Sequence, residues 1–213
     1  MYRHKAQLVG LAFIATVFFG CNTTTETLEP PDNRFYVEFT ADGEEVLYED
    51  GQNNYGNGPG IDSYPDSAGR LHSQFTTFMR SALDPNYDNN ILTIQMVSYW
   101  PDTTWVLYNT SFLMFDEGPY DYGSWNEDST YFGINGAVIT FTDGNGKIWS
   151  SNQLYGTQES WSNFEITDHK AVDETQYGAK TKGTFECRVF DGQGESIDLR
   201  NGNFHARTIF KHE

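Results

Sequence analysis

The sequence predicts a mostly β domain, built as an antiparallel β-sandwich or an open barrel. Aromatic residues make up 16% of the 213 residues, and aromatic side chains favour strands over helices. Extended runs recur along the chain, and Gly-rich turn sequences separate them. Antiparallel hairpins at this spacing are typical of sandwiches and barrels, and the composition predicts a largely aromatic core.

Three hairpins are predicted where extended runs lie on both sides of an Asp-Gly turn. They span residues 35–48, 137–149 and 183–199. An Asp-Gly pair between two extended runs is the strongest short-range signal of a hairpin. In the third hairpin, Phe185, Cys187 and Val189 alternate with Glu186 and Arg188, so the first three share one face of the strand. This alternation predicts that Cys187 is buried.

Four further segments complete the predicted sheet and its connections. Strands are predicted over 91–100 and, after a turn at Asn201-Gly202, over 204–210. Residues 71–79 have both helical and extended spacing, and their threonines favour a strand. Residues 51–67 are rich in Gly and Asn and are predicted to form a long loop, of the kind that is often functional or mobile.

One short helix is predicted near residues 103–115. Asp102 can cap its first turn, and aromatic residues recur within it at spacings of three and four. Gly118-Pro119 then ends the helical pattern. No internal repeat and no second domain boundary is evident.

The first 20 residues have the features of a signal peptide. A basic start precedes an apolar stretch at 8–19, which is too short to span a bilayer. Gly20 followed by Cys21 resembles a bacterial lipobox, and the resemblance implies that the Cys21 thiol carries a lipid such as a palmitate-containing diacylglycerol. A cleaved secretory peptide with an incidental cysteine is the alternative.

The chain then divides into a tether and one domain. Residues 21–33 comprise the predicted lipidated cysteine and a flexible tether without apolar periodicity, and residues 34–213 form a single β-rich domain. The formal net charge of -17 argues against binding to nucleic acid, which requires an excess of Lys and Arg. With Cys21 acylated, Cys187 has no disulfide partner.

The C-terminal part resembles a family of proteins. Gly-Thr-Phe-Glu-Cys at 183–187 and Asp-Gly-Gln-Gly at 191–194 precede Leu-Arg-Asn-Gly-Asn-Phe at 199–204. This order resembles small, uncharacterised β-rich lipoproteins of Bacteroidota. The resemblance implies attachment to the outer membrane, on its periplasmic or its surface side, and carries no functional residue with it.

No catalytic motif is present in the sequence. A Gly-x-Ser-x-Gly elbow and a His-Glu-x-x-His zinc motif are both absent. Acidic residues are so numerous that no pair stands out for glycoside hydrolysis, although an unrecognised hydrolase stays an alternative. We therefore expect a non-catalytic interaction or accessory module of an outer-membrane assembly.

Glycan binding is the alternative function that the sequence supports with residues. Sugar sites combine an aromatic platform with polar side chains, as other small-ligand sites do. One segment holds four candidates for such a platform: Trp100, Tyr120, Tyr122 and Trp125. Tyr122 and Trp125 lie near a predicted turn, so these two are expected to be the most exposed.

Calcium binding is a weaker alternative, and no other cofactor is expected. Asp116, Glu117 and Asp121 surround Gly118-Pro119 and could supply oxygen ligands. The two Asp-Gly-x-Gly sequences at 143–146 and 191–194 also begin like calcium loops. Both lack the bidentate Glu at the twelfth position, so we interpret them as ordinary hairpin turns.

Overall fold

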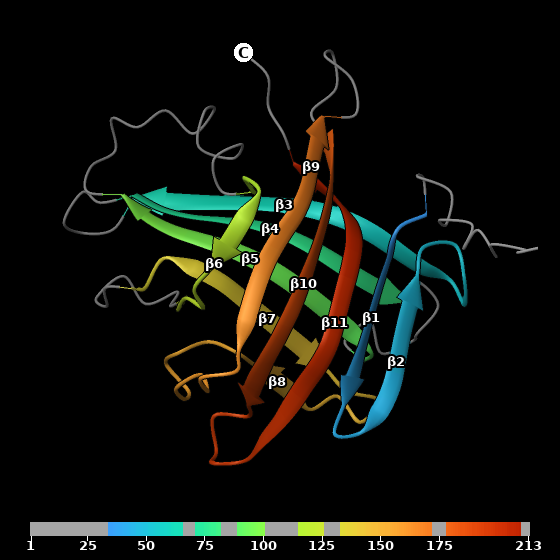
Figure 1. The fold of residues 1–213 in the computed structure, drawn as a ribbon, viewed down its shortest axis with the longest axis vertical. Coiled ribbons are helices and arrows are strands. Elements are labelled where there is room, and N and C mark those ends of the chain that lie inside the picture. The colour runs from blue at the N-terminus through green and yellow to red at the C-terminus, as the bar shows by residue number, and fades with distance from the viewer. Residues whose placement is uncertain are drawn as a thin grey trace, which may run out of the picture. The chain divides into compact units, whose positions relative to one another are not determined.

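The computed structural model describes residues 34–65, 71–81, 89–100, 115–125, 133–171 and 178–209, all within the compact unit Asn33–Glu213. Their strands form one antiparallel sheet that curves into a nearly closed barrel, which confirms the predicted fold class (Figure 1). No helix occurs in these ranges, and hence none that could cross a membrane. The predicted helix at 103–115 lies outside them, except for Phe115 in a turn.

The sheet contains eleven strands. In chain order they are β1 (Tyr36–Ala41), β2 (Glu44–Glu49), β3 (Tyr55–Pro65), β4 (Leu71–Ser81), β5 (Ile91–Trp100), β6 (Gly118–Tyr120), β7 (Gly136–Thr142), β8 (Ile148–Ser150), β9 (Asn163–Ala171), β10 (Gly178–Phe190) and β11 (Ser196–Ile209). Hydrogen bonds join them in the order β2-β1-β11-β10-β8-β7-β5-β4-β3, and β9 pairs with both β10 and β6.

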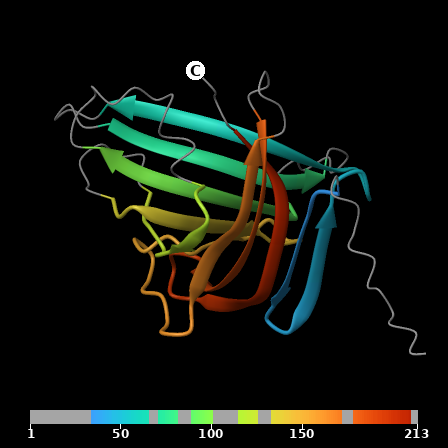
Figure 2. The same cartoon turned by 45° about the horizontal axis from the view of Figure 1, so that its top comes forward.

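Two groups of strands cross each other and enclose the core. β3, β4, β5 and β7 run together on one side, and β9, β10, β11, β1 and β2 cross them on the other side (Figures 1 and 2). Aromatic rings join the two groups: the ring of Phe39 on β1 lies edge-on to that of Phe141 on β7, 5.3 Å between centroids. Phe185 and Phe204 extend this cluster on β10 and β11. The predicted aromatic core is therefore present.

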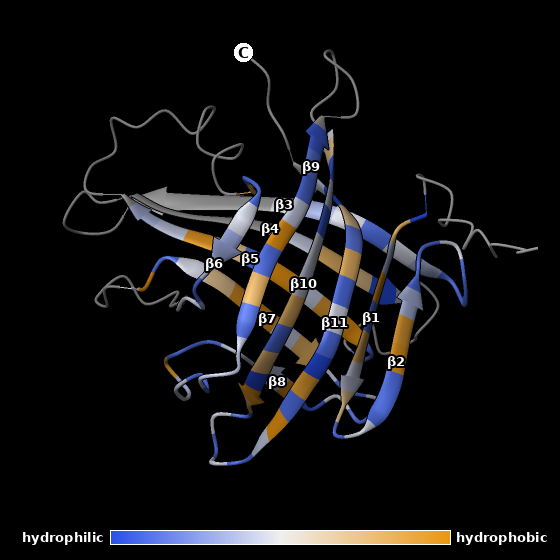
Figure 3. Ribbon diagram, in the orientation of Figure 1, coloured by the Kyte–Doolittle hydropathy of each residue, from blue (hydrophilic) through white to orange (hydrophobic). Residues whose placement is uncertain are grey.

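Burial alternates strictly along β10, and Figure 3 shows the matching alternation of hydropathy. Phe185, Cys187 and Val189 are fully buried, whereas Glu186 and Arg188 point to the outer face, as the sequence predicts. Cys187 forms no disulfide within the described ranges, and its burial raises the pKa of the thiol to about 12. This thiol is an inert part of the core.

The three predicted hairpins are present as β1–β2, β7–β8 and β10–β11. In the β7–β8 turn, the Asp143 Oδ1 atom accepts the main-chain N–H groups of Asn145 and Lys147, at 2.8 and 3.0 Å. Asp191 does the same for two N–H groups in the β10–β11 turn. Because these oxygens serve their own turns, the interpretation as ordinary hairpin turns is confirmed.

The predicted turn at Asn201-Gly202 is wrong, because both residues lie within β11. They form a β-bulge, in which Arg200 and Asn201 together oppose the single residue Glu186. Asn201 has a positive φ of 53°, and a Cβ atom on Gly202 would lie only 2.5 Å from the Phe185 carbonyl oxygen. The same dipeptide that favours a turn thus supplies the backbone freedom that a bulge needs.

The predicted loop at 51–67 is also wrong, because residues 55–65 form β3 and pair with β4 along their whole length. Main-chain pairing holds this Gly-rich strand, and the ring of Phe78 covers Gly58, where a Cβ atom would lie 2.4 Å from the ring. The Asn57 amide donates to the Phe78 carbonyl oxygen at 2.9 Å and accepts the N–H of Arg207 on β11 at 2.5 Å. Asn57 thereby links β3 to β11.

Candidate binding groove

A groove of about 380 Å³ lies on the outer face of β5, β7 and β8. Nine described residues line it: Gln95, Trp125, Val138, Thr140, Ile148, Ser150, Asn152, Leu154 and Tyr155. The strand residues among them alternate with core residues, and the sheet register places Gln95 opposite Val138 and Thr140 opposite Ser150. Residues of three adjacent strands and of two connecting segments therefore line the groove together.

The sides of the groove carry exposed apolar side chains. Ile148, Leu154 and Tyr155 are 60%, 40% and 55% exposed. They are three of the five large hydrophobic side chains that are exposed among the described residues, so apolar surface is concentrated here. Trp125 and Val138 are nearly buried below them, packed against each other in a small second core outside the sheet. A concentrated apolar patch of this kind is typical of a binding surface.

The described lining contains no charged side chain. This is unusual in a chain with 30 acidic and 13 basic residues and a net charge of -17. The polar groups of the lining are hydroxyls and carboxamides. The described lining therefore offers apolar contact and neutral hydrogen bonds to a ligand.

Two hydroxyl groups lie side by side in the base of the groove. The Thr140 Oγ1 and Ser150 Oγ atoms are 3.3 Å apart, and Ser150 Oγ also accepts the N–H of Asn152 at 3.2 Å. One of the two O–H groups forms the bond between them. The second O–H group stays available as a donor, and a lone pair of Thr140 as an acceptor.

Asn152 fixes the side of the groove that carries Leu154 and Tyr155. Its Nδ2 atom donates to the Trp125 carbonyl oxygen at 2.7 Å, and its Oδ1 atom accepts the N–H of Leu154 at 3.1 Å. The N–H of Tyr155 donates to the Asn152 carbonyl oxygen at 2.9 Å. One buried carboxamide thus joins the two segments beside the groove, which gives the apolar side chains a defined position.

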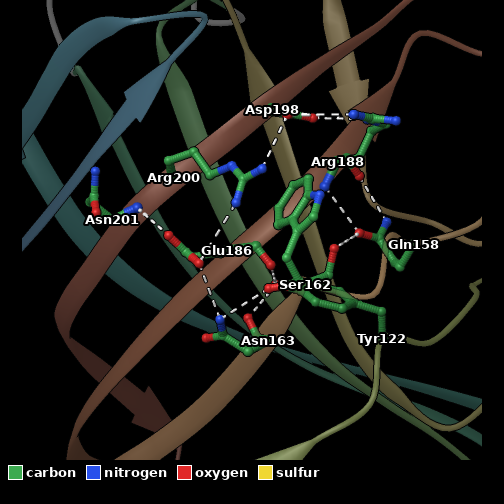
Figure 4. Close-up of polar contacts among 10 residues, drawn as sticks. Tyr122, Gln158, Ser162, Asn163, Glu186, Arg188, Asp198, Arg200 and Asn201 are labelled. Carbon is green, nitrogen blue, oxygen red and sulfur yellow. Dashed lines mark hydrogen bonds and ion pairs between the residues drawn. The ribbon is translucent and has the colours of Figure 1, made fainter.

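The same connecting segment continues over the outer face of β10 and is bound there by Gln158 (Figure 4). The Gln158 carboxamide forms two hydrogen bonds with the main chain of Arg188. Its Nε2 atom donates to the Arg188 carbonyl oxygen at 2.8 Å, and its Oε1 atom accepts the Arg188 N–H at 3.0 Å. Ser162 donates to the same Oε1 atom at 3.1 Å. Residues 151–162 therefore lie against the sheet rather than extending from it.

Beside Gln158, charged side chains form a network on β10 and β11 (Figure 4). Arg188 donates to Asp198 at 2.8 Å, and the Arg200 guanidinium bonds Asp198 at 3.4 Å. Arg200 also lies over the Trp161 ring, with 3.1 Å between its Cζ atom and the ring centroid.

The hydrogen bond from Arg188 lowers the pKa of Asp198, although burial opposes the shift. Glu186, 3.9 Å from Arg200, accepts the N–H of Asn201 in the bulge.

The structure does not bring Tyr120, Tyr122 and Trp125 together on one exposed surface, as the predicted glycan site would require. The expected exposure of Tyr122 and Trp125 is wrong, since they are only 4% and 8% exposed. The Tyr122 hydroxyl points toward the carbonyl oxygens of Asn163 and Glu186, at 2.9 and 3.0 Å, because a buried hydroxyl needs a partner. Tyr120 is half-buried against Phe164, and its hydroxyl donates to the Asp116 carbonyl oxygen. The Trp100 side chain lies outside the described part of the structure.

Of these four aromatic residues, only Trp125 is part of the described groove lining, where it contributes to the base. The other apolar contacts come from Ile148, Leu154 and Tyr155, which the sequence did not single out. Ile148 alternates with the buried Trp149, and this alternation is a signal that it faces outward. Leu154 and Tyr155 lie in an irregular segment that carries no comparable signal.

The predicted calcium ligands do not form a metal site. Asp116, Glu117 and Asp121 are exposed, and no three His, Cys, Asp or Glu side chains in the described ranges are grouped so that they could hold a metal ion. The predicted gathering of these three carboxylates is therefore wrong, because they do not converge around the short strand β6 that separates them.

Comparison with known proteins adds no relative: no family model, no curated protein and no solved structure matches this chain.

Proposed function

We propose that this chain is a lipid-anchored, non-catalytic binding module of the cell envelope, and that its groove on β5, β7 and β8 binds an uncharged ligand. The observation that carries the proposal is the composition of the groove. Exposed apolar side chains and neutral hydrogen-bonding groups meet there, and its described lining has no charge in a strongly acidic protein. Concave apolar sites with a few placed polar groups are typical ligand sites.

The chemistry of the lining favours binding over catalysis. General acid–base and nucleophilic mechanisms need a carboxylate, an imidazole, an amine or an activated hydroxyl or thiol. The described lining offers the hydroxyls of Thr140 and Ser150, which bond each other and have no histidine or carboxylate beside them within that lining. The described lining also holds the Tyr155 phenol but no carboxylate, imidazole or amine, and its polar groups are suited to orienting a ligand.

The anchor is inferred from the sequence. Cys21 would carry the lipid, and residues 22–33 would hold the domain close to the membrane, where it could serve as an accessory module of an outer-membrane assembly. Anchoring by two or more acyl chains is stable, whereas a single chain binds only reversibly. The net negative charge would repel an anionic bilayer surface and keep the groove free of lipid headgroups.

Site-specific photo-crosslinking tests the binding function. A photoreactive amino acid is placed at Leu154 in the groove or, as a control, at Leu47 on the outer face of β2, in cells that make the full chain. Both side chains are well exposed, at 40% and 53%. We expect a discrete adduct from position 154 and none from position 47. The same adduct pattern from both positions, or none from either, would contradict the proposal.

The anchor has its own test. We expect the full chain to incorporate a labelled fatty acid and to partition into detergent, and Cys21→Ser to lose both properties. The variant Cys187→Ser is a control, because Cys187 is buried in the core. Equal labelling of Cys21→Ser and the unchanged chain would show that no lipid is attached at this position.

A further inference from the structure

We infer that the ligand of the groove is a neutral glycan, and that Tyr155 provides the surface on which a sugar ring stacks. This inference rests on the proposed function and names the class of ligand. It depends on the charge of the groove, on the arrangement of its apolar and hydroxyl groups, and on the position of Tyr155.

The charge of the groove selects against ionic ligands. An anionic ligand would find no Arg or Lys in the described lining and would be repelled by a protein with a net charge of -17. A cationic ligand would find no carboxylate there to replace its hydration. A ligand without charge avoids both costs at the described lining, which favours it over sugar acids, phosphorylated groups and basic peptides.

The mixed character of the groove selects among neutral ligands. A pyranose ring has an apolar face formed by its C–H groups and a rim of hydroxyls that both donate and accept hydrogen bonds. The groove has matching parts: apolar sides at Ile148, Leu154 and Tyr155, and the Thr140–Ser150 hydroxyl pair in its base. A purely aliphatic ligand would cover these hydroxyls without bonding them, which is unfavourable.

Tyr155 is placed to present its ring to a ligand. Its main-chain N–H is held by the Asn152 carbonyl oxygen, and its ring lies beside Gly192 in the β10–β11 turn. A Cβ atom at Gly192 would be 3.5 Å from the Tyr155 Cδ1 atom, which is an ordinary van der Waals contact, so the ring lies close against this turn. The ring is supported on one side and 55% exposed. A supported, exposed aromatic ring can stack on a sugar with little loss of side-chain entropy.

A glycan microarray with the full chain in detergent tests the inference. The array carries neutral oligosaccharides and polysaccharides together with uronic-acid-containing and sulfated glycans. We expect binding to one or more neutral glycans and none to the anionic glycans. The dissociation constant for a neutral hit is then measured by titration for the unchanged chain and for each variant.

Four variants connect the binding to the groove. Tyr155→Ala should weaken it at least about tenfold, and Tyr155→Phe should stay within about twofold, because the ring is retained. Thr140→Val keeps the shape and removes a hydroxyl, so it should weaken binding roughly fivefold. Leu47→Ala is the control and should bind as the unchanged chain does. All four should keep their melting temperature within a few degrees.

The outcomes separate the inference from the proposed function. Neutral glycan binding that Tyr155→Ala loses and Leu47→Ala keeps supports the inference. A silent array, binding only to anionic glycans, or neutral binding unaffected by Tyr155→Ala overturns it. If the array is silent while position 154 still gives its crosslink, the groove binds a partner of another class, such as a protein segment. If both fail, the proposed function fails as well.

Discussion

The segment 151–162 borders two surfaces of opposite character on the outside of the barrel. On its β7–β8 side lies the groove, whose described lining has no charge and exposes apolar side chains. On its β10–β11 side, Arg188 and Arg200 bond Asp198, and Arg200 lies 3.9 Å from Glu186 (Figure 4). Arg188 also bonds Glu159, which belongs to the segment itself. The charged surface helps to hold the segment to the sheet through the Arg188–Glu159 ion pair, whereas the uncharged surface is the one that we propose binds a ligand.

The largest effect is expected from the bulge that positions the charged surface. Gly202→Ala places a methyl group about 2.5 Å from the Phe185 carbonyl oxygen, so the strand must shift. We expect the free energy of unfolding to fall by about 3 kcal/mol, measured by urea denaturation. Gly56→Ala in β3 is the matched control, since nothing lies within 4 Å of its Cβ position, and it should be nearly neutral. Equal stability of the two variants would contradict the role of Gly202.

A smaller effect is expected when the segment loses its attachment to β10. Gln158→Ala removes the two hydrogen bonds to the main chain of Arg188, and we expect a loss of about 2 kcal/mol in the free energy of unfolding. The variant should also weaken ligand binding in the groove, because Leu154 and Tyr155 lie on the same segment. Gln193→Ala, in the exposed β10–β11 turn, should change neither property. Unaltered stability of Gln158→Ala would show that the segment is held by other contacts.

As the pH falls, the stability contributed by the charged surface should decrease before ligand binding in the groove changes. The hydrogen bond from Arg188 lowers the pKa of Asp198, and the one from Lys147 lowers the pKa of Asp191 to about 2. Both groups therefore contribute stability above the ordinary Asp pKa of about 3.9, and this contribution is lost as the pH falls from about 4 toward 2.

Urea denaturation at a series of pH values measures this loss, and Asp198→Asn should show a shallower dependence than the unchanged chain. Ligand binding in the groove should be independent of pH between about 5 and 8 wherever the fold is intact, because its described lining has no carboxylate, imidazole or amine. A pH profile of binding that follows a carboxylate would contradict the assignment of the groove.

The smallest effect on stability is expected in the groove itself. Ile148→Thr and Leu154→Ser replace exposed apolar side chains, so each should change the free energy of unfolding by no more than about 0.5 kcal/mol. Both should nevertheless reduce binding. A large loss of stability in either variant would show that the apolar sides of the groove support the fold rather than the ligand.

The sequence predicted the elements whose signal is local. The alternation along residues 183–190 and the Asp-Gly turns specify strands and hairpins within a few residues, and both predictions are confirmed. Prediction from the sequence failed where residues distant along the chain decide how the strands pair. β3 has little side-chain pattern of its own and is formed by its register with β4, and Asn201-Gly202 is a bulge because its neighbours pair on both sides.

The groove could not be predicted for the same reason. Its lining comes from three strands and two irregular segments, which only the sheet register brings together. Aromatic composition alone did not separate Tyr122, whose hydroxyl is bonded inside the barrel, from Tyr155, whose ring is exposed.

The pairing of β1 with β11 determines when the folding of the barrel can finish. It joins Tyr36, in the first strand, to His205, in the last, and β11 also lies against β10. Contacts so distant along the chain make folding slow. If the first 20 residues direct export, the closing strand pair cannot form until the last strand has crossed the membrane.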